Sequence, residues 1–425
     1  MAGNPDALGR DIVAGSPLRR RLRISRRSFL RGLSATIAVP ATAQLLAACG
    51  DQLYTSGNLV LASPDHPVKW PLSTKVPMIE PGLTPEPGST LKIYNYADYI
   101  GPGVIKAFTK LYDVKVTVST FNDTDEALTK IASGAVDFDL HFPSYDQIGK
   151  MVAGDLLRPL THEYITNIDN LWPQFKNPWY DQGWQYSVPY TVYNTGIGWR
   201  NDLIDFDVSA LDNPYDVFWD PANRGKCAVI DDWHTTMSMV LLRNGIRDVN
   251  SGRVADLEVI RRDLKAMSEA TDPRVTITMY NDLPAGQYSI AMMWGGDAVN
   301  AQYYLPKGVP AEVLSYWWAE DGLGLVDNDL MVLPAGGENP VAAHFFINHM
   351  LDAAMASRNF GYIGYQPPQN SISPESVVAD GYMTEGLVAA AVRPDDFETS
   401  PRLLELDPVV DAEWHNIWQE YKASG

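Results

Sequence analysis

Between Leu91 and Ser144 the sequence alternates short strand patterns with helix patterns. "LKIYNYADYI" begins as a strand, residues 102–112 place Val104, Phe108 and Leu111 on one helical face, and "VKVTVSTF" alternates as a strand. A further helix pattern around "DTDEALTKIASG", a short apolar strand in "DFDLHF" and a helix from Ser144 follow. Strands that alternate with helices of this length predict an α/β fold with a mostly parallel sheet. Such sheets bind ligands beyond the carboxyl ends of their strands.

The rest of the chain supports this interpretation. "YSIAMMW" is typical of a buried strand. Four apolar residues at helical spacing predict an amphipathic helix: Leu257, Ile260, Leu264 and Met267. A second stripe at this spacing predicts a core-facing helix near the C-terminus: Trp414, Ile417, Trp418 and Tyr421. The 377 residues after position 48, in a chain that is 45% apolar, are enough for two cores.

The first 48 residues have the pattern of an export signal. They hold eight arginines and two aspartates, and their apolar stretch 33–48 contains Pro40. At about sixteen residues this stretch is short for a bilayer span of roughly twenty. Arg26 and Arg27 stand in a Ser-Arg-Arg-x-Phe-Leu-Arg frame that resembles the twin-arginine signal, with Arg31 where Lys is commoner. Residues 1–48 are therefore interpreted as a signal peptide.

The end of this stretch predicts lipidation. Leu46-Ala47-Ala48-Cys49 resembles a bacterial lipobox, although a chance cysteine after alanines is the alternative. An acylated Cys49 would anchor the protein on the outer side of the cytoplasmic membrane. Only Cys227 would then remain, which excludes an intramolecular disulfide and predicts a buried, inert thiol.

Residues 49–90 read as a linker. Seven prolines between positions 64 and 87 leave room for neither a helix nor an inner strand. We expect a lipidated Cys49 followed by an extended tether, with Trp70 as a point of contact with the domain.

Charge narrows the choice of ligand. Because residues 1–48 carry eight of the 33 basic and two of the 52 acidic residues, the remainder holds 25 basic and 50 acidic residues. This balance argues against nucleic acid and against an anionic ligand. Solubility outside the cell is the alternative explanation for the acidity.

The sequence shows no recognisable catalytic motif. It has no nucleophile elbow, P-loop, zinc-protease motif or dinucleotide fingerprint, and the interpretation includes no cofactor. His344 and His349 are five apart, which places them on different faces of a helix, so no metal site is predicted from them. Asp327 and Asp329 are a possible pair for a hard cation, without further ligands at suitable spacing.

Aromatic and acidic residues do gather where strands are predicted to end. They occur in "YNYADYI", "IDDWHTT" and "MMWGGDAV". Each has a structural alternative: Asp232 and Ser144 as helix caps, Trp294 as core. Their common place at strand ends favours a shared binding site.

These segments, together with "DFDLHFPSYDQIGKM", "YSVPYTVYNTGIGWRNDLI" and "FGYIGYQPPQNS", occur in the order found in the spermidine/putrescine-binding proteins of ABC importers. The resemblance runs from about Leu91 to the C-terminus. It implies the two-lobed type II periplasmic-binding-protein fold, with the ligand in the cleft between lobes. Lobe 1 would hold 91–192 and 298–362, and lobe 2 would hold 193–297 and 363–425, with crossings near Tyr193 and Asp297.

The resemblance also implies a ligand site. The residues of this site would be Tyr96, Asp98, Tyr99, Ser144, Asp232, Trp294, Asp297, Asp329 and Tyr365. Tyr96 stands where Trp is usual, Ala97 replaces a hydrogen-bonding residue, and Thr235 replaces a glutamate found in many members. These departures leave the preferred chain length of the amine open.

The resulting hypothesis is a non-enzymatic, lipid-anchored, exported subunit that captures a polyamine by lobe closure and delivers it to a membrane permease. Within the same fold a sugar or oligosaccharide is the first alternative, because aromatic rings also stack on sugars, and a cleft poor in acids would support it. An anion such as thiosulfate would require basic residues. An exported hydrolase would use Asp297 and Asp329 as acid and base.

Overall fold

The computed structural model describes residues 60–121, 124–319 and 322–424. All of them belong to the second of two compact units, Asp51–Gly425. The predicted signal peptide and Cys49 lie outside the described residues. No described helix is both long enough and apolar enough to cross a membrane.

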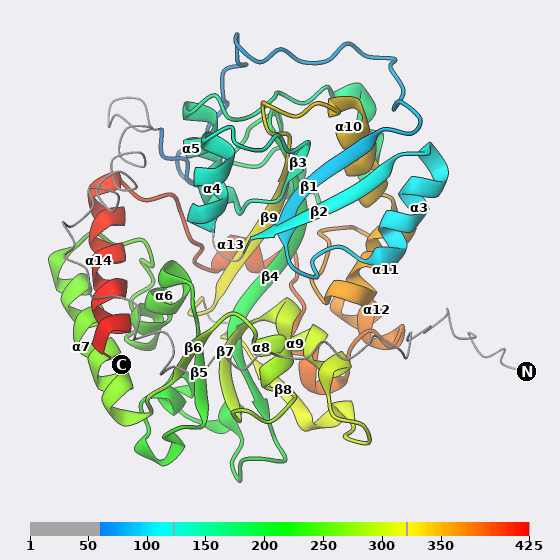
Figure 1. The fold of residues 1–425 in the computed structure, drawn as a ribbon. Helices are drawn as coiled ribbons and strands as arrows, with labels where there is room; N and C mark the ends of the chain where they lie inside the picture. Colours follow the sequence, from blue (N-terminus) through cyan, green and yellow to red (C-terminus); the bar gives the residue numbers. More distant parts are fainter. Residues whose placement is uncertain (1–59, 122–123, 320–321, 425) are drawn as a thin grey trace, which may run out of the picture. The chain divides into compact units, whose positions relative to one another are not determined.

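The described residues form a nine-stranded mixed sheet with the order β2-β1-β3-β9-β4-β7-β5-β6, and β8 pairs with β4 (Figure 1). The strands are β1 Thr90–Tyr96, β2 Lys115–Phe121, β3 Leu140–His141, β4 Ser187–Arg200, β5 Cys227–Ile230, β6 Arg274–Thr276, β7 Ile290–Trp294, β8 Leu314–Trp317 and β9 Leu325–Val332.

The first half of the sheet is built as predicted. β1 is parallel to both β2 and β3, and helices follow these strands in the chain: α3 Pro102–Tyr112, α4 Thr124–Ala132 and α5 Ile148–Ala153. Val104 and Phe108 of α3 are fully buried, whereas Leu111, which has the same helical spacing, is 64% exposed. Leu111 belongs to the last turn of α3, where Tyr112 packs on Phe108 instead.

The second half repeats the arrangement. β5 is parallel to β6 and β7. The helices in this part are α6 Trp233–Arg243, α7 Val254–Ala270, α8 Met279–Asp282 and α9 Gly295–Ala301. The C-terminal α14, Pro408–Ser424, packs on α6 and α7, as Figure 1 shows in red and green. Both predicted apolar stripes, on α7 and α14, are buried.

Two long strands join the halves. β4 pairs with β9 from Ser187 to Thr195, and then with β7 and β8 as far as Arg200. These pairings are antiparallel, so the sheet is parallel only within each half, unlike the mostly parallel sheet that was predicted. β8 pairs with β4 from Ile197 to Arg200, and β9, the next strand in the chain, pairs with both β4 and β3. The remaining helices are α10 Pro340–Met350, α11 Ala353–Ile363, α12 Pro374–Ala379 and α13 Asp396–Thr399.

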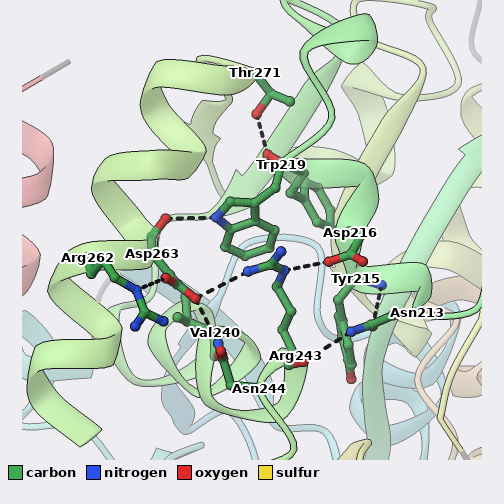
Figure 2. Close-up of polar contacts among 11 residues, drawn as sticks. Asn213, Tyr215, Asp216, Trp219, Val240, Arg243, Asn244, Arg262, Asp263 and Thr271 are labelled. Carbon is green, nitrogen blue, oxygen red and sulfur yellow. Dashed lines mark hydrogen bonds and ion pairs between the residues drawn. The ribbon is translucent and has the colours of Figure 1, made fainter. Parts of the chain in front are cut away.

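A polar cluster ties α6 and α7 to the loop before β5. The guanidinium of Arg243 on α6 lies 4.1 Å from the ring centre of Trp219. Figure 2 shows this arginine with its partners. Arg243 also pairs with Asp216 at 2.7 Å and with Asp263 of α7 at 3.2 Å. The Trp219 indole N–H donates to the Asp263 carbonyl at 2.8 Å. One arginine thus fixes three segments at once, which stabilises the second half.

The proline-rich segment is not a free tether over its described part. Trp70 is only 5% exposed, and Arg158 Nη1 and the Tyr164 hydroxyl donate to the carbonyls of Pro77 and Glu80. The contact predicted for Trp70 is confirmed. Cys227 is buried as predicted, and burial raises the pKa of its thiol to about 12.

Candidate functional site

A cavity of about 280 Å³ lies at the carboxyl ends of the parallel strands. All six of these strands contribute lining residues at or just beyond their ends, and the long strands β4 and β9 add Tyr193, Asp327 and Asp329. Segments outside the sheet supply further lining residues, among them Tyr280, Tyr365 and Leu403. The structure brings together every residue predicted for the site: Tyr96, Asp98, Tyr99, Ser144, Asp232, Trp294, Asp297, Asp329 and Tyr365. This follows from the fold, since parallel strands share one edge for their carboxyl ends.

Asp297 is a buried acid of the cavity with a single hydrogen-bond partner among the described residues. It lies in the first turn of α9, is 6% exposed, and accepts a hydrogen bond from the Tyr365 hydroxyl at 2.8 Å on Oδ1. Its buried Oδ2 has no partner among the described residues. Burial raises the pKa of Asp297 to about 7. Gly296 permits this packing, because a Cβ there would lie 2.2 Å from the Tyr365 ring.

β9 carries two further acids on one face, since residues two apart on a strand point the same way. Asp329 accepts from Tyr99 at 2.7 Å and from Tyr193 at 3.3 Å, and Asp327 accepts from Tyr145 at 2.6 Å. Burial raises the pKa of both carboxyls to about 7. Both acids are thus held by tyrosine hydroxyls and not by cations.

The two predicted helix caps differ. Asp232 caps α6 by accepting from the Thr235 N–H at 2.8 Å, and it also lines the cavity, so both interpretations of this residue hold. Burial raises its pKa to about 6. Ser144 makes no cap hydrogen bond; its hydroxyl donates to Asp146, whose pKa is raised by burial.

Aromatic rings form the walls between the acids. Tyr99 meets the rings of Tyr96 and Tyr365 edge-on, at centroid distances of 5.7 and 4.9 Å. Trp294 is only half-buried and lines the cavity, so the core alternative does not describe it fully. Asp98 is exposed and has a positive φ of 56°, at the turn that follows β1.

Sequence reasoning missed part of the lining. Among the described residues it also includes Phe121, Asp125, Tyr145, Asp146, Tyr193, Trp233 and Tyr280. Tyr145 and Asp146 could have been found as direct neighbours of Ser144, whereas no local signal marks Tyr280. Altogether seven aspartates and no lysine or arginine line the cavity within the described part of the chain. No described group of three or more His, Cys, Asp or Glu side chains is arranged to hold a metal ion.

Comparison with known proteins agrees with this geometry. Residues 103–385 match the family model of the bacterial extracellular solute-binding proteins. The spermidine/putrescine-binding periplasmic protein of Escherichia coli is 28% identical over 294 residues, which cover 68% of this chain and 81% of that protein. The putrescine/cadaverine-binding protein of Pseudomonas aeruginosa is 25% identical over 293 residues, covering 67% and 80%.

Solved structures confirm the fold. The spermidine/putrescine ABC transporter substrate-binding protein PotD from Streptococcus pneumoniae superposes with a TM-score of 0.65 at 24% identity, covering 79% of this chain and 99% of that one. The predicted two-lobed α/β fold is therefore confirmed. The periplasmic relative also supports an exported location. The family model spans most of the chain, which therefore belongs to the bacterial extracellular solute-binding proteins and is not an enzyme.

Proposed function

We propose that this chain is the substrate-binding subunit of an ABC importer and that it binds a polyamine in the cavity. The observation that carries the proposal is the lining itself: among the described residues, seven aspartates and no lysine or arginine surround one cavity. The carboxylates of such a site need positively charged partners, and a cationic ligand would supply them. The polyamine names of the matched relatives point the same way.

The chemistry of a polyamine suits this lining. Its ammonium groups are separated by apolar methylenes, so it needs carboxylates at separate points and aromatic faces between them. Hydrogen bonds to charged groups contribute about 1.5–3 kcal/mol each, and cation–π contacts about 0.5–2 kcal/mol. Micromolar binding corresponds to roughly −8 kcal/mol, and association itself costs about 4–15 kcal/mol, so several contacts of both kinds are needed.

Capture would proceed by closure of two lobes. We assign the two halves of the sheet to the lobes, with β4 and β9 as the crossing strands. Lobe 1 keeps residues 91–192 and gains the chain from β9 to about 362, while lobe 2 holds 193–324 and 363–425. A ligand that contacts both lobes stabilises the closed form by its differential affinity, and this form would dock on the permease.

The alternatives fit the cavity less well. A neutral sugar would require a cleft poor in acids, and thiosulfate would require basic residues; neither matches the lining. A hydrolase with Asp297 and Asp329 is excluded by membership of a solute-binding family.

Anchoring forms a separate part of the proposal. Residues 1–48 would direct export and Cys49 would carry the lipid, holding the protein at the cytoplasmic membrane. Expression of wild type and Cys49→Ser, followed by membrane fractionation, tests this: only the wild type should stay with the membrane. Equal partitioning of the two would remove the anchor from the proposal.

Calorimetric titration of the purified full-length chain tests the ligand. Putrescine and spermidine should bind one-to-one, whereas a neutral disaccharide and thiosulfate should give no heat of binding. If only the disaccharide bound, the proposed ligand would be a sugar and not a polyamine.

A further inference from the structure

The described proline-rich segment, residues 60–89, lies outside the family match of residues 103–385. Part of it, residues 68–73, clamps the loop that precedes β4. The Val68 N–H donates to the Trp179 carbonyl at 2.8 Å, and the Gln182 N–H donates back to the Val68 carbonyl at 2.7 Å. These are the paired bonds of a short strand-like contact, so the segment and the loop hold one another in register.

Trp70 secures this contact from inside. Its side chain is almost fully buried, and the indole N–H donates to the Tyr180 carbonyl at 2.8 Å. The Tyr186 hydroxyl donates to the Pro71 carbonyl at 2.8 Å and accepts from the Ser73 N–H at 2.7 Å. Four hydrogen bonds besides that of Trp70 therefore attach six residues to one loop.

The same loop supports the wall of the cavity. The Tyr180 ring stacks on Tyr145 at 5.3 Å with an interplanar angle of 13°, and Trp179 meets Tyr145 edge-on at 5.3 Å. The Tyr180 hydroxyl also accepts from Asn328 Nδ2 at 3.2 Å. Tyr145 in turn donates to Asp327 at 2.6 Å inside the cavity. Contacts thus run without a break from Trp70 through Tyr180 and Tyr145 to the cavity carboxylate of Asp327.

We propose that Trp70 is a positioning residue for the ligand-binding carboxylate of Asp327, acting through Tyr180 and Tyr145. No residue of the clamp, 68–73, belongs to the described lining, so its effect on the ligand is indirect. The inference rests on the proposed function, because it assumes that Asp327 meets a cationic ligand.

The hydrogen bond from Tyr145 gives the inference a measurable signature. Burial raises the pKa of Asp327, and the Tyr145 hydroxyl acts against that rise. Asp327 also faces the Leu403 N–H, Asp146, Asp329 and the charge of Arg402, none of which the variants alter. Loosening Tyr145 therefore leaves a larger fraction of Asp327 protonated and moves the pH dependence of amine binding to higher pH.

A double-mutant cycle on the full-length chain tests the inference, with spermidine affinity measured by calorimetry at several pH values. We expect Tyr145→Phe to weaken binding about tenfold through loss of a bond to a charged group. Trp70→Ala should weaken binding about threefold to tenfold, but hardly further once Tyr145 is already Phe, since both act through one contact. Leu72→Ala is the matched control, because Leu72 lies in the same segment with 49% of its surface exposed.

Trp70→Phe covers the case in which Trp70→Ala does not fold, since it removes the indole N–H and keeps an aromatic ring. A purely structural role would lower the melting temperature and leave affinity and its pH profile unchanged, which would overturn the inference. Additive effects of Trp70 and Tyr145 substitutions on affinity would also overturn it. Absence of amine binding by the wild type would instead reject the proposed function.

Discussion

This protein has two neighbouring groups of partly or fully buried aspartates, and their pKa values are shifted in opposite directions. In the cavity, burial raises the pKa of Asp297, Asp327 and Asp329 to about 7. Beside it, burial works in the same direction on Asp411, but His415 and Lys150 outweigh it and lower the pKa to about 2.

The second group is a seam between α4 and α5 on one side and α14 on the other. Lys150 Nζ lies 2.9 Å from Asp411 Oδ2, and His415 contacts Asp411 at 2.8 Å and Asp125 at 3.2 Å. Burial alone would lower the pKa of His415, yet these carboxylates raise it to about 10. The seam carries its own cations, one of which, His415, also pairs with the cavity residue Asp125, whereas no lysine or arginine lines the cavity within the described residues. The acid Asp411 of the seam is thus paired with cations of the protein itself, whereas the buried acids Asp297, Asp327 and Asp329 of the cavity have no lysine or arginine beside them in the lining.

Asp297→Asn should give the largest effect, because it removes the charge and keeps the shape. Amine affinity should fall about 100-fold through loss of a charge-assisted hydrogen bond. The free protein should melt ~2 °C or more higher at pH 8, since an unpaired buried carboxylate destabilises the fold there. Calorimetry and thermal unfolding measure both. A lower melting temperature would show Asp297 to be a structural residue like those of the seam.

Lys150→Met should destabilise the protein, in contrast to Asp297→Asn, because it removes a cation from the seam. Asp411 and the nearby Glu405 would be left facing one another, and the free energy of unfolding should fall by ~2 kcal/mol. Urea unfolding at pH 7 measures this. An unchanged midpoint would mean that the seam does not depend on its cations.

The affinity for amines should depend on pH. An amine binds the ionised carboxylates, and their pKa of about 7 in the free protein means that protonation competes below that value. Affinity should therefore fall about tenfold for each such carboxylate between pH 8 and pH 6. Titrations across this range check it; a flat profile would show that these acids are not titrated by ligand binding.

His415 should give the seam a different pH window. Its folded pKa of about 10 exceeds the ordinary value of 6.5, so the stability it adds is complete below pH 6.5 and is lost as the pH rises toward 10. Wild type should exceed His415→Gln by about 1 kcal/mol at pH 6.5, a modest value because His415 is one-third exposed, and by little at pH 9.5. An equal difference at both pH values would contradict the pairing.

Lys422→Gln should have the smallest effect. Lys422 pairs with Asp231 at 3.0 Å, one residue before the cavity residue Asp232, but both partners are more than a third exposed. We expect a loss of less than ~0.5 kcal/mol and unchanged amine affinity. A loss comparable with that of Lys150→Met would mean that exposure does not separate these pairs.

Features with local causes could be predicted from the sequence. The apolar stripes of α7 and α14 follow from helical spacing, and the nine predicted site residues line one cavity because they follow parallel strands or lie on neighbouring elements. Features that depend on distant partners could not. Leu111 has the spacing of a core residue but lies at a helix end, and Tyr280 reaches the cavity from a short helix without any local mark.

The sequence by itself determined the α/β class, the core-facing helices and the acids and aromatics of the site, because periodicity and strand-end position are local properties. Only the tertiary structure decided that β8 and β9 both pair with β4, since these pairings join residues over a hundred positions apart. The tertiary structure also decided which aspartates pair with a positively charged side chain. Asp297 and Asp411 look alike in the sequence, and their opposite pKa shifts come from neighbours that only folding supplies.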